Sequence, residues 1–180
     1  MSFSSPFPEV DIPTASVYDY LFSGLSGPEA EHLDRVALVD STTGRQTSYR
    51  EMVARIDSFA GALAARGLGV GDVVGLLAPN SSAFAVAFHG ILRCGATATT
   101  VNALFTAKDI AKQLTDSRAT MLITVSALAS QAAEAVEIAG LPAENLVVLD
   151  GPGRSADGHP NAVELLDGNP APPEVTFAPS

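Results

Sequence analysis

The stretch from Gly71 to Thr106 constrains the fold more than any other part of the chain. It begins with an apolar run at 73–77 that ends at a Pro-Asn turn, a pattern typical of a strand buried on both faces. The segment from Ser82 to Arg93 is apolar nearly all round, which predicts a buried helix, and a second strand is expected at 96–101. Strand, helix and strand in this order form a βαβ unit, so the two strands should run parallel.

Similar signals predict helices and strands on both sides of this unit. Ser48 and Glu51 form a capping box before an amphipathic helix that should end at Gly67, and Thr106 and Asp109 form a similar start for a helix to about residue 117. The other expected elements are a helix at 16–22, a β-hairpin at 36–49 with Gly44 at its tip, strands at 119–125 and 146–149, and a helix at 127–139. This alternation predicts an α/β fold, a mainly parallel sheet flanked by helices, with an N-terminal β-hairpin.

A change in composition divides the chain near residue 150. Residues 1–150 are predicted to form an α/β subdomain, with the hairpin at 36–49 and a βαβ core at 72–125. Residues 151–180 are dominated by Gly, Pro, Asp and Asn, which predicts a loop with one short helical turn at 162–166.

Net charge and cysteine content exclude several classes of protein. The formal net charge is −10 and the chain has only two lysines, which disfavours nucleic-acid binding. The single cysteine, Cys94, excludes an internal disulfide and a cysteine-based zinc site, and its place beside the apolar helix indicates a core residue. No secretory signal is visible, and a polar turn interrupts the uncharged stretch at 73–92. We therefore expect a soluble cytoplasmic protein without a membrane span.

Five motifs in and after the βαβ unit carry a resemblance to a known family. They are GDVV at 71–74, the PNS turn at 79–81, the F-x-x-A-F-x-G helix at 84–90, the GATATT strand at 95–100 and the N-x-x-x-T-x-x-D-I segment at 102–110. With the hairpin region, they resemble the N-terminal region of the adenylate-forming acyl-CoA synthetases (the ANL superfamily), especially its 4-coumarate–CoA ligase branch. The resemblance runs over most of residues 7–150.

The resemblance implies part of a ligase whose chemistry is supplied elsewhere. The family joins a carboxylate to ATP to give an acyl-adenylate and pyrophosphate, and the thiol of coenzyme A then forms a thioester. It implies ATP, Mg²⁺ and coenzyme A for a full-length parent, and a small carboxylic acid, aromatic or fatty, as substrate. The family's Lys-Gly phosphate loop is absent from these 180 residues. The chain is therefore expected to be an incomplete part of the large N-terminal domain, inactive alone, with no catalytic, cofactor-binding or metal-binding residue.

A few local candidates for a functional site compete with structural roles. The glycines at 67–71 follow a helix and precede a strand, the reverse of the order in a phosphate loop, so a helix stop and a turn are predicted. His89 is predicted to be a hydrogen-bonded core or interface histidine, and Asp72 a surface carboxylate or turn cap. Asn102 and Thr106 are the best site-adjacent candidates, because ligands gather beyond the carboxyl ends of strands. Capping and loop formation compete for both residues.

Three hypotheses for function remain. The first is the N-terminal piece of an acyl-CoA synthetase of the coumarate-ligase type, and the second is a non-catalytic standalone binding or scaffold module of the same fold. The third, a dinucleotide-binding domain, ranks low because the glycines lie in the wrong place. Under the first hypothesis the chain alone should expose apolar surface and self-associate.

Overall fold

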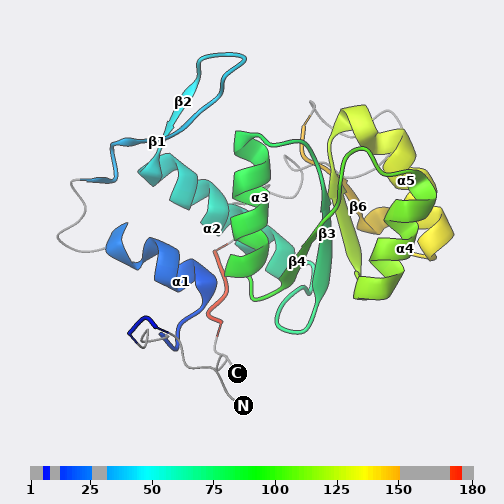
Figure 1. Cartoon of the computed structure of the whole chain (residues 1–180), viewed down its shortest axis with the longest axis horizontal. Helices are drawn as coiled ribbons and strands as arrows, with labels where there is room; N and C mark the ends of the chain where they lie inside the picture. The colour runs from blue at the N-terminus through cyan, green and yellow to red at the C-terminus, as the bar shows by residue number, and fades with distance from the viewer. Residues whose placement is uncertain (1–5, 9–12, 26–31, 151–170, 176–180) are drawn as a thin grey trace.

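A four-stranded parallel sheet lies between two pairs of helices (Figure 1). The computed structural model describes residues 6–8, 13–25, 32–150 and 171–175. The strands, in the spatial order β4-β3-β5-β6, are β4 (Thr97–Thr100), β3 (Val73–Leu77), β5 (Met121–Thr124) and β6 (Leu146–Val148). All three pairings are parallel, which confirms the mainly parallel sheet predicted from the sequence.

The two faces of the sheet are covered by different helices. Helices α2 (Tyr49–Ala65) and α3 (Ser82–Arg93) cover one face, where they pack against side chains such as Leu76 and Ile123. Helices α4 (Ala107–Ser117) and α5 (Ala129–Ala139) cover the other face and pack against Leu77 and Leu122. The hydrophobic core therefore has two halves, with the sheet between them.

A hairpin and a short helix lie beside this three-layer body (Figure 1). Strands β1 (Val36–Val39) and β2 (Gln46–Ser48) pair antiparallel, as predicted for the hairpin, and Gly44 adopts φ +71° in the turn between them. Helix α1 (Val17–Phe22) begins at Ser16, whose hydroxyl accepts a hydrogen bond from the Asp19 amide. Short 3₁₀ turns follow or precede other elements, namely η1 (Ser23–Leu25), η3 (Ser126–Leu128) and η4 (Ala143–Asn145).

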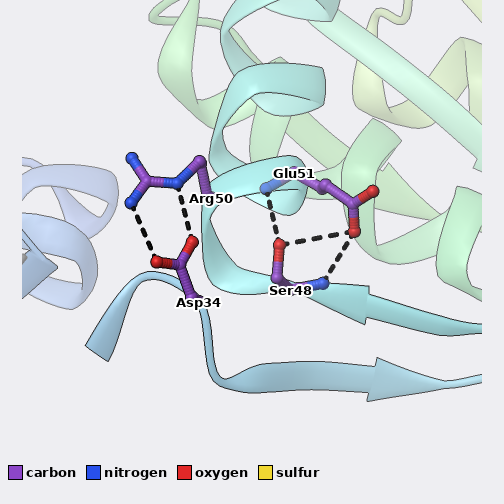
Figure 2. Close-up of polar contacts among 4 residues, drawn as sticks. All are labelled: Asp34, Ser48, Arg50 and Glu51. Atoms are coloured by element: carbon purple, nitrogen blue, oxygen red, sulfur yellow. Dashed lines mark hydrogen bonds and ion pairs between the residues drawn. The ribbon is translucent and has the colours of Figure 1, made fainter. Parts of the chain in front are cut away.

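The start of α2 is fixed by two sets of polar contacts. Ser48 Oγ accepts from the Glu51 amide at 3.2 Å, and the Glu51 carboxylate accepts from the Ser48 amide at 2.9 Å (Figure 2). Next to this capping box, Arg50 Nε and Nη2 donate to the two carboxylate oxygens of Asp34 at 2.9 and 3.3 Å (Figure 2). These contacts join the segment before β1 to the first turn of α2, so they set the direction in which the hairpin leaves the body.

The observed elements differ from the predicted ones in several places. Strands β4 and β6 are shorter than the predicted 96–101 and 146–149. Strand β5 is shorter than 119–125, because the amide of Ala119 closes α4 by donating to the carbonyl of Leu114. The predicted helix at 127–139 begins with the 3₁₀ turn η3 before α5. Helix α3 is also less buried than predicted, since only Ala87, Gly90 and Ile91 are fully buried on it. The predicted helical turn at 162–166 lies outside the described residues.

Candidate functional site

The strand order creates one position at which the connections diverge. The crossover after β3 runs through α3 to β4, whereas the crossover after β5 runs through α5 in the opposite direction to β6. The two helices also lie on opposite faces of the sheet. Open α/β sheets bind ligands outside the carboxyl ends of the strands at such a switch point. The candidate site is therefore expected beyond β3 and β5.

A cleft of about 550 Å³ lies at this position. Its apolar wall comes from α2, α3 and the residues after β5 and β6, and its polar wall comes from the hairpin, α2, the start of α3 and the end of β6. The apolar residues used here are Phe59, Val86, Val125 and Leu149, and the polar residues are Asp40, Arg45, Arg55, Ser81 and Asp150. We refer to this feature as the switch-point cleft.

Hydrogen bonds between strand ends hold the adjoining sheet in place. The buried Thr124 hydroxyl donates to the Leu77 carbonyl at 2.9 Å, which ties the end of β5 to the end of β3. The Asp150 carboxylate accepts from the amide and the hydroxyl of Ser126, at 2.6 and 3.0 Å, which ties the residues after β6 to those after β5. The strand ends beside the cleft are thus cross-linked by bonds within the chain.

The hairpin and α3 supply the remaining polar groups. The Asp40 carboxylate accepts hydrogen bonds from the amides of Thr42 and Thr43. These bonds hold the pKa of its carboxyl below the ordinary value, and those from Thr43 have the largest effect. Ser81 caps α3 by accepting from the Phe84 amide at 3.1 Å. In the described part of the chain, neither Arg45 nor Arg55 uses its guanidinium in a hydrogen bond or ion pair. The two acidic residues of the cleft are therefore engaged in hydrogen bonds. The two arginines act through their charge: after the Ser48 hydrogen bonds, they help to lower the pKa of the Glu51 carboxyl.

The structure places Asn102 and Thr106 away from this cleft. Both follow β4, which is an edge strand, and neither lines the cleft. Asn102 Oδ1 accepts from the Leu104 amide at 2.9 Å, and Thr106 forms the capping box of α4 with Asp109. The competing structural roles, loop formation and helix capping, are thus the ones that the structure shows for these two residues.

The glycine-rich run at 67–71 is a helix stop and a turn. Gly67, at φ +85°, closes α2, and Gly71, at φ +98°, precedes β3. The carboxylate of Asp72 accepts from the Gly69 amide at 2.9 Å, which is the role of a turn cap. A carboxylate already bound to this turn is unfavourable for a phosphate at the same place, in agreement with the predicted structural role.

His89 and Cys94 lie on or at the end of α3. The ring of His89 makes edge contacts with Phe22 and Phe88, and burial lowers its pKa. Its Nδ1 is buried without a hydrogen-bond partner in the described chain, so the hydrogen bond predicted for this core histidine is not seen at that atom. Cys94 is buried, donates to the Ile91 carbonyl, and has a raised pKa because of burial, which suits the predicted core role.

A second polar cluster, which the sequence did not reveal, joins α1, α2, α3 and residues 171–175. Arg93 pairs with Asp57 at 3.2 Å, lies 5.1 Å from the centre of the Tyr18 ring and donates to the Pro173 carbonyl at 3.0 Å. Burial first, and then the Asp57 carboxylate, raise the pKa of Tyr18 to about 12. The three side chains are 75 residues apart at most in the sequence, and no spacing rule connects them. Tyr18 and Asp57 also line a cleft of about 510 Å³ between α1 and α2. We assign the cluster to packing, because its contacts join α1, α2, α3 and residues 171–175.

The residues of the switch-point cleft were also missed by sequence reasoning. Arg45, Arg55 and Asp150 come from three segments that only the observed strand order brings together. One signal was available, because Ser126 and Asp150 are polar residues that directly follow predicted strands.

Two other kinds of feature, a metal cluster and a membrane-spanning helix, are absent from the described ranges. No cluster of three or more His, Cys, Asp or Glu side chains there could hold a metal ion. Among the helices of those ranges, none combines the length and the apolar character needed to cross a bilayer.

Sequence comparison connects the chain to AMP-binding enzymes and to CoA ligases. The AMP-binding enzyme family matches residues 28–178. The chain is 36% identical over 150 residues to 4-coumarate–CoA ligase 5 of Oryza sativa subsp. japonica, covering 83% of this chain and 26% of that protein. It is 39% identical over 102 residues to the probable CoA ligase CCL5 of Humulus lupulus, covering 57% of this chain and 18% of that protein. The chain therefore spans about a quarter or less of the length of these curated relatives.

Solved structures similar to this chain also come from CoA ligases. A benzoate CoA ligase from Burkholderia xenovorans LB400 superimposes with a TM-score of 0.72 at 30% identity, over 88% of this chain and 29% of that one. The anthranilate CoA ligase AuaEII gives a TM-score of 0.79 at 24% identity, over 93% of this chain and 31% of that one, which shows a shared fold.

Proposed function

Because the chain belongs to the AMP-binding enzyme family, we propose that it forms the N-terminal part of an ATP-dependent acyl- or aryl-CoA ligase. The reaction would join a small carboxylic acid to AMP, with release of pyrophosphate, and then transfer the acyl group to the thiol of coenzyme A. The single observation that carries this proposal is the family match over residues 28–178. The relatives named as 4-coumarate and benzoate CoA ligases support a carboxylic acid as the substrate class.

Within such an enzyme we propose a scaffold role for this chain. Its parallel sheet and four packed helices would support the parts of the protein that hold ATP, Mg²⁺ and coenzyme A. We assign no catalytic, cofactor-binding or metal-binding residue to it. The polar groups that the sequence singled out support this, because Asp72, Asn102 and Thr106 are engaged in turns and caps. Whether the acid is aromatic or fatty is left to experiment.

The test is ATP–pyrophosphate exchange, measured on the complete gene product and on the 180-residue chain. We expect exchange by the complete product in the presence of one class of acid, from a panel of coumarate-like aromatic acids and fatty acids. We expect none from the 180-residue chain with any acid. Exchange catalysed by the short chain would refute the scaffold role. A complete product that exchanges with no acid would favour the non-catalytic binding module instead.

A further inference from the structure

We propose that protonation of His89 releases helix α1 from helix α3, so that the contact between these two helices is an acid-sensitive switch. The proposal goes beyond the proposed function and does not depend on it. It concerns a histidine that does not line the switch-point cleft.

His89 lies among aromatic rings where α1 meets α3. Its ring makes an edge contact with the ring of Phe22 on α1, with 5.2 Å between the ring centres. A second edge contact, at 5.4 Å, joins it to Phe88 on its own helix. The ring of Phe22 also lies 4.8 Å from that of Tyr18, which is buried against α2. The His89 ring is therefore part of the aromatic surface on which α1 packs.

The buried Nδ1 atom makes this contact sensitive to protonation. Nδ1 of His89 has no hydrogen-bond partner in the described chain. A neutral imidazole can carry its proton on Nε2 and leave Nδ1 as an acceptor, whereas an imidazolium ring has an N–H at both nitrogens. That second N–H would be buried without an acceptor, which is unfavourable, and more so for a charged group. Burial accordingly lowers the pKa of His89.

The titratable groups on the surrounding helices do not compensate an imidazolium ring at His89. Arg93 follows one turn later on α3, and two positive charges at this spacing repel each other. On α2, Asp57 already pairs with Arg93 and accepts from the hydroxyl of Tyr18. On α1, Asp19 is exposed and bonded to the residue that caps the helix. The shift in the pKa of His89 comes from burial, without a contribution from either carboxylate.

Helix α1 is short enough for the loss of this contact to release it. It has six residues, and helices of this length are not stable alone in water, so α1 depends on its packing. Val17, Tyr20 and Leu21 are 58%, 63% and 52% exposed, which leaves Tyr18 and Phe22 to hold the helix. Protonation of His89 thus acts on one of the two aromatic side chains that attach α1.

The direction of the pH effect follows from the burial of His89. A released His89 has the ordinary pKa of about 6.5, and the docked ring has a lower one. The released state therefore binds more protons, so docking is at full strength above about pH 6.5 and weakens as the pH falls below it. At about pH 5.5 a histidine of ordinary pKa is about ten times more often protonated than neutral, so the loss reaches at most about tenfold there.

The experiment is hydrogen exchange of the 180-residue chain, followed by NMR at about pH 7.5 and about pH 5.5. The reporters are the amides of Tyr20 and Ser23, which donate to carbonyls one turn earlier. The reference is the amide of Ile110 at the start of α4. After correction for the intrinsic exchange rate at each pH, protection of the α1 amides should fall by about threefold to about tenfold on acidification. Protection of Ile110 should not change.

Variants assign the effect to His89. His89→Gln cannot take up a proton, so its α1 amides should be equally protected at both pH values. The matched control is His32→Gln, which removes the other histidine of the described ranges and should retain the loss of protection. If α1 is already released in His89→Gln at both pH values, His89→Leu keeps an apolar side chain beside Phe22 and provides the same test.

Four outcomes would overturn the proposal. They are a loss of protection in α1 smaller than about threefold, an equal loss at Ile110, the same loss in a folded His89 variant as in the parent chain, and disappearance of the loss in His32→Gln.

Discussion

The two helices that cross over from β3 and β4 face water in different ways. Helix α4 is amphipathic, and it buries Ile110 and Leu114 against the sheet while it exposes Lys112 and Asp116. Helix α3 is apolar nearly all round, and Phe84 and other large side chains stay only half-buried on it. The outer side of α4 thus has the composition of a finished protein surface, and that of α3 does not.

The comparison shows where this fold is open to further contacts. Helix α1 and residues 171–175 contact part of α3, through Phe22 beside His89 and through the Arg93 hydrogen bond to Pro173. The rest of the outer side of α3 is left half-exposed. The self-association expected from exposed apolar surface stays a prediction, and light scattering on the purified chain would test it. Four sets of substitutions would test the contrast between the two helices.

The largest effect is expected from truncating a leucine on each helix. Leu114 on α4 is 1% exposed, so Leu114→Ala should lower the free energy of unfolding by about 3 kcal/mol. Leu92 on α3 is half-buried, and Leu92→Ala should cost less than about 1 kcal/mol. Urea unfolding of both variants gives the comparison. Equal losses would mean that the outer side of α3 is as well packed as the core.

The next effect concerns the inner side of α3, which should be as tight as that of α4. A Cβ on Gly90 would lie 2.7 Å from Cδ1 of Phe59, so Gly90→Val should cost about 2 kcal/mol by overpacking. Ala83→Val, at an exposed position on the same helix, is the control, and it should lower the free energy of unfolding by only a few tenths of the Gly90→Val loss. The measurement is thermal unfolding followed by circular dichroism. A Gly90→Val variant as stable as the parent chain would mean that the contact between α3 and α2 is loosely packed.

A smaller effect is expected at the helix starts. Thr106→Ala removes a hydroxyl that accepts from the Asp109 amide, and Ser81→Ala removes one that accepts from the Phe84 amide. Each change should cost about 1 kcal/mol, and Thr106→Ser should cost almost nothing because serine caps equally well. Chemical unfolding of the three variants measures this. A loss in Thr106→Ser as large as in Thr106→Ala would assign the effect to the methyl group instead of the cap.

The smallest effect is a difference in acid sensitivity between the two helix starts. Hydrogen bonds from the side chain and then the amide of Thr106 lower the pKa of Asp109 from its ordinary value of 3.8, whereas the first turn of α3 has no acidic residue. A carboxyl with a depressed pKa stabilises the fold above 3.8, and this contribution disappears as the pH falls through the folded-state pKa.

The variant Asp109→Asn should therefore lose stability at neutral pH and show a shallower fall in unfolding free energy between about pH 5 and about pH 2. Urea unfolding across that range is the measurement. A parallel curve for the variant and the parent chain would show that Asp109 does not contribute to the acid dependence.

Helix boundaries could be predicted because their signals are local. Ser48 caps α2 and Thr106 caps α4 as the sequence indicated, and α3 and α4 span the predicted residues. The stop at Gly67 is equally local, since it depends only on a positive φ after the last turn of α2. Strand ends were less accurate, because they depend on partners that are distant in sequence, as the shortened β5 shows.

The candidate site could not be predicted in the same way. Its residues lie between positions 40 and 150. They meet only because β3 pairs with β5 in addition to β4. Asn102 and Thr106 satisfied the rule that ligands gather beyond strand ends, but β4 proved to be an edge strand. Right-handed crossovers restrict the possible strand orders without selecting one of them.

The central place of β3 has a consequence for how the chain folds during synthesis. The strand needs a neighbour on each side, and on one of them Leu77 accepts its bond from Thr124, 47 residues later. Until the ribosome has released β5, one edge of an apolar strand stays unpaired, with its amides and carbonyls open to other chains. Parallel pairing also closes longer loops than a hairpin does, so collapse should be slower here than in the local β1–β2 ribbon.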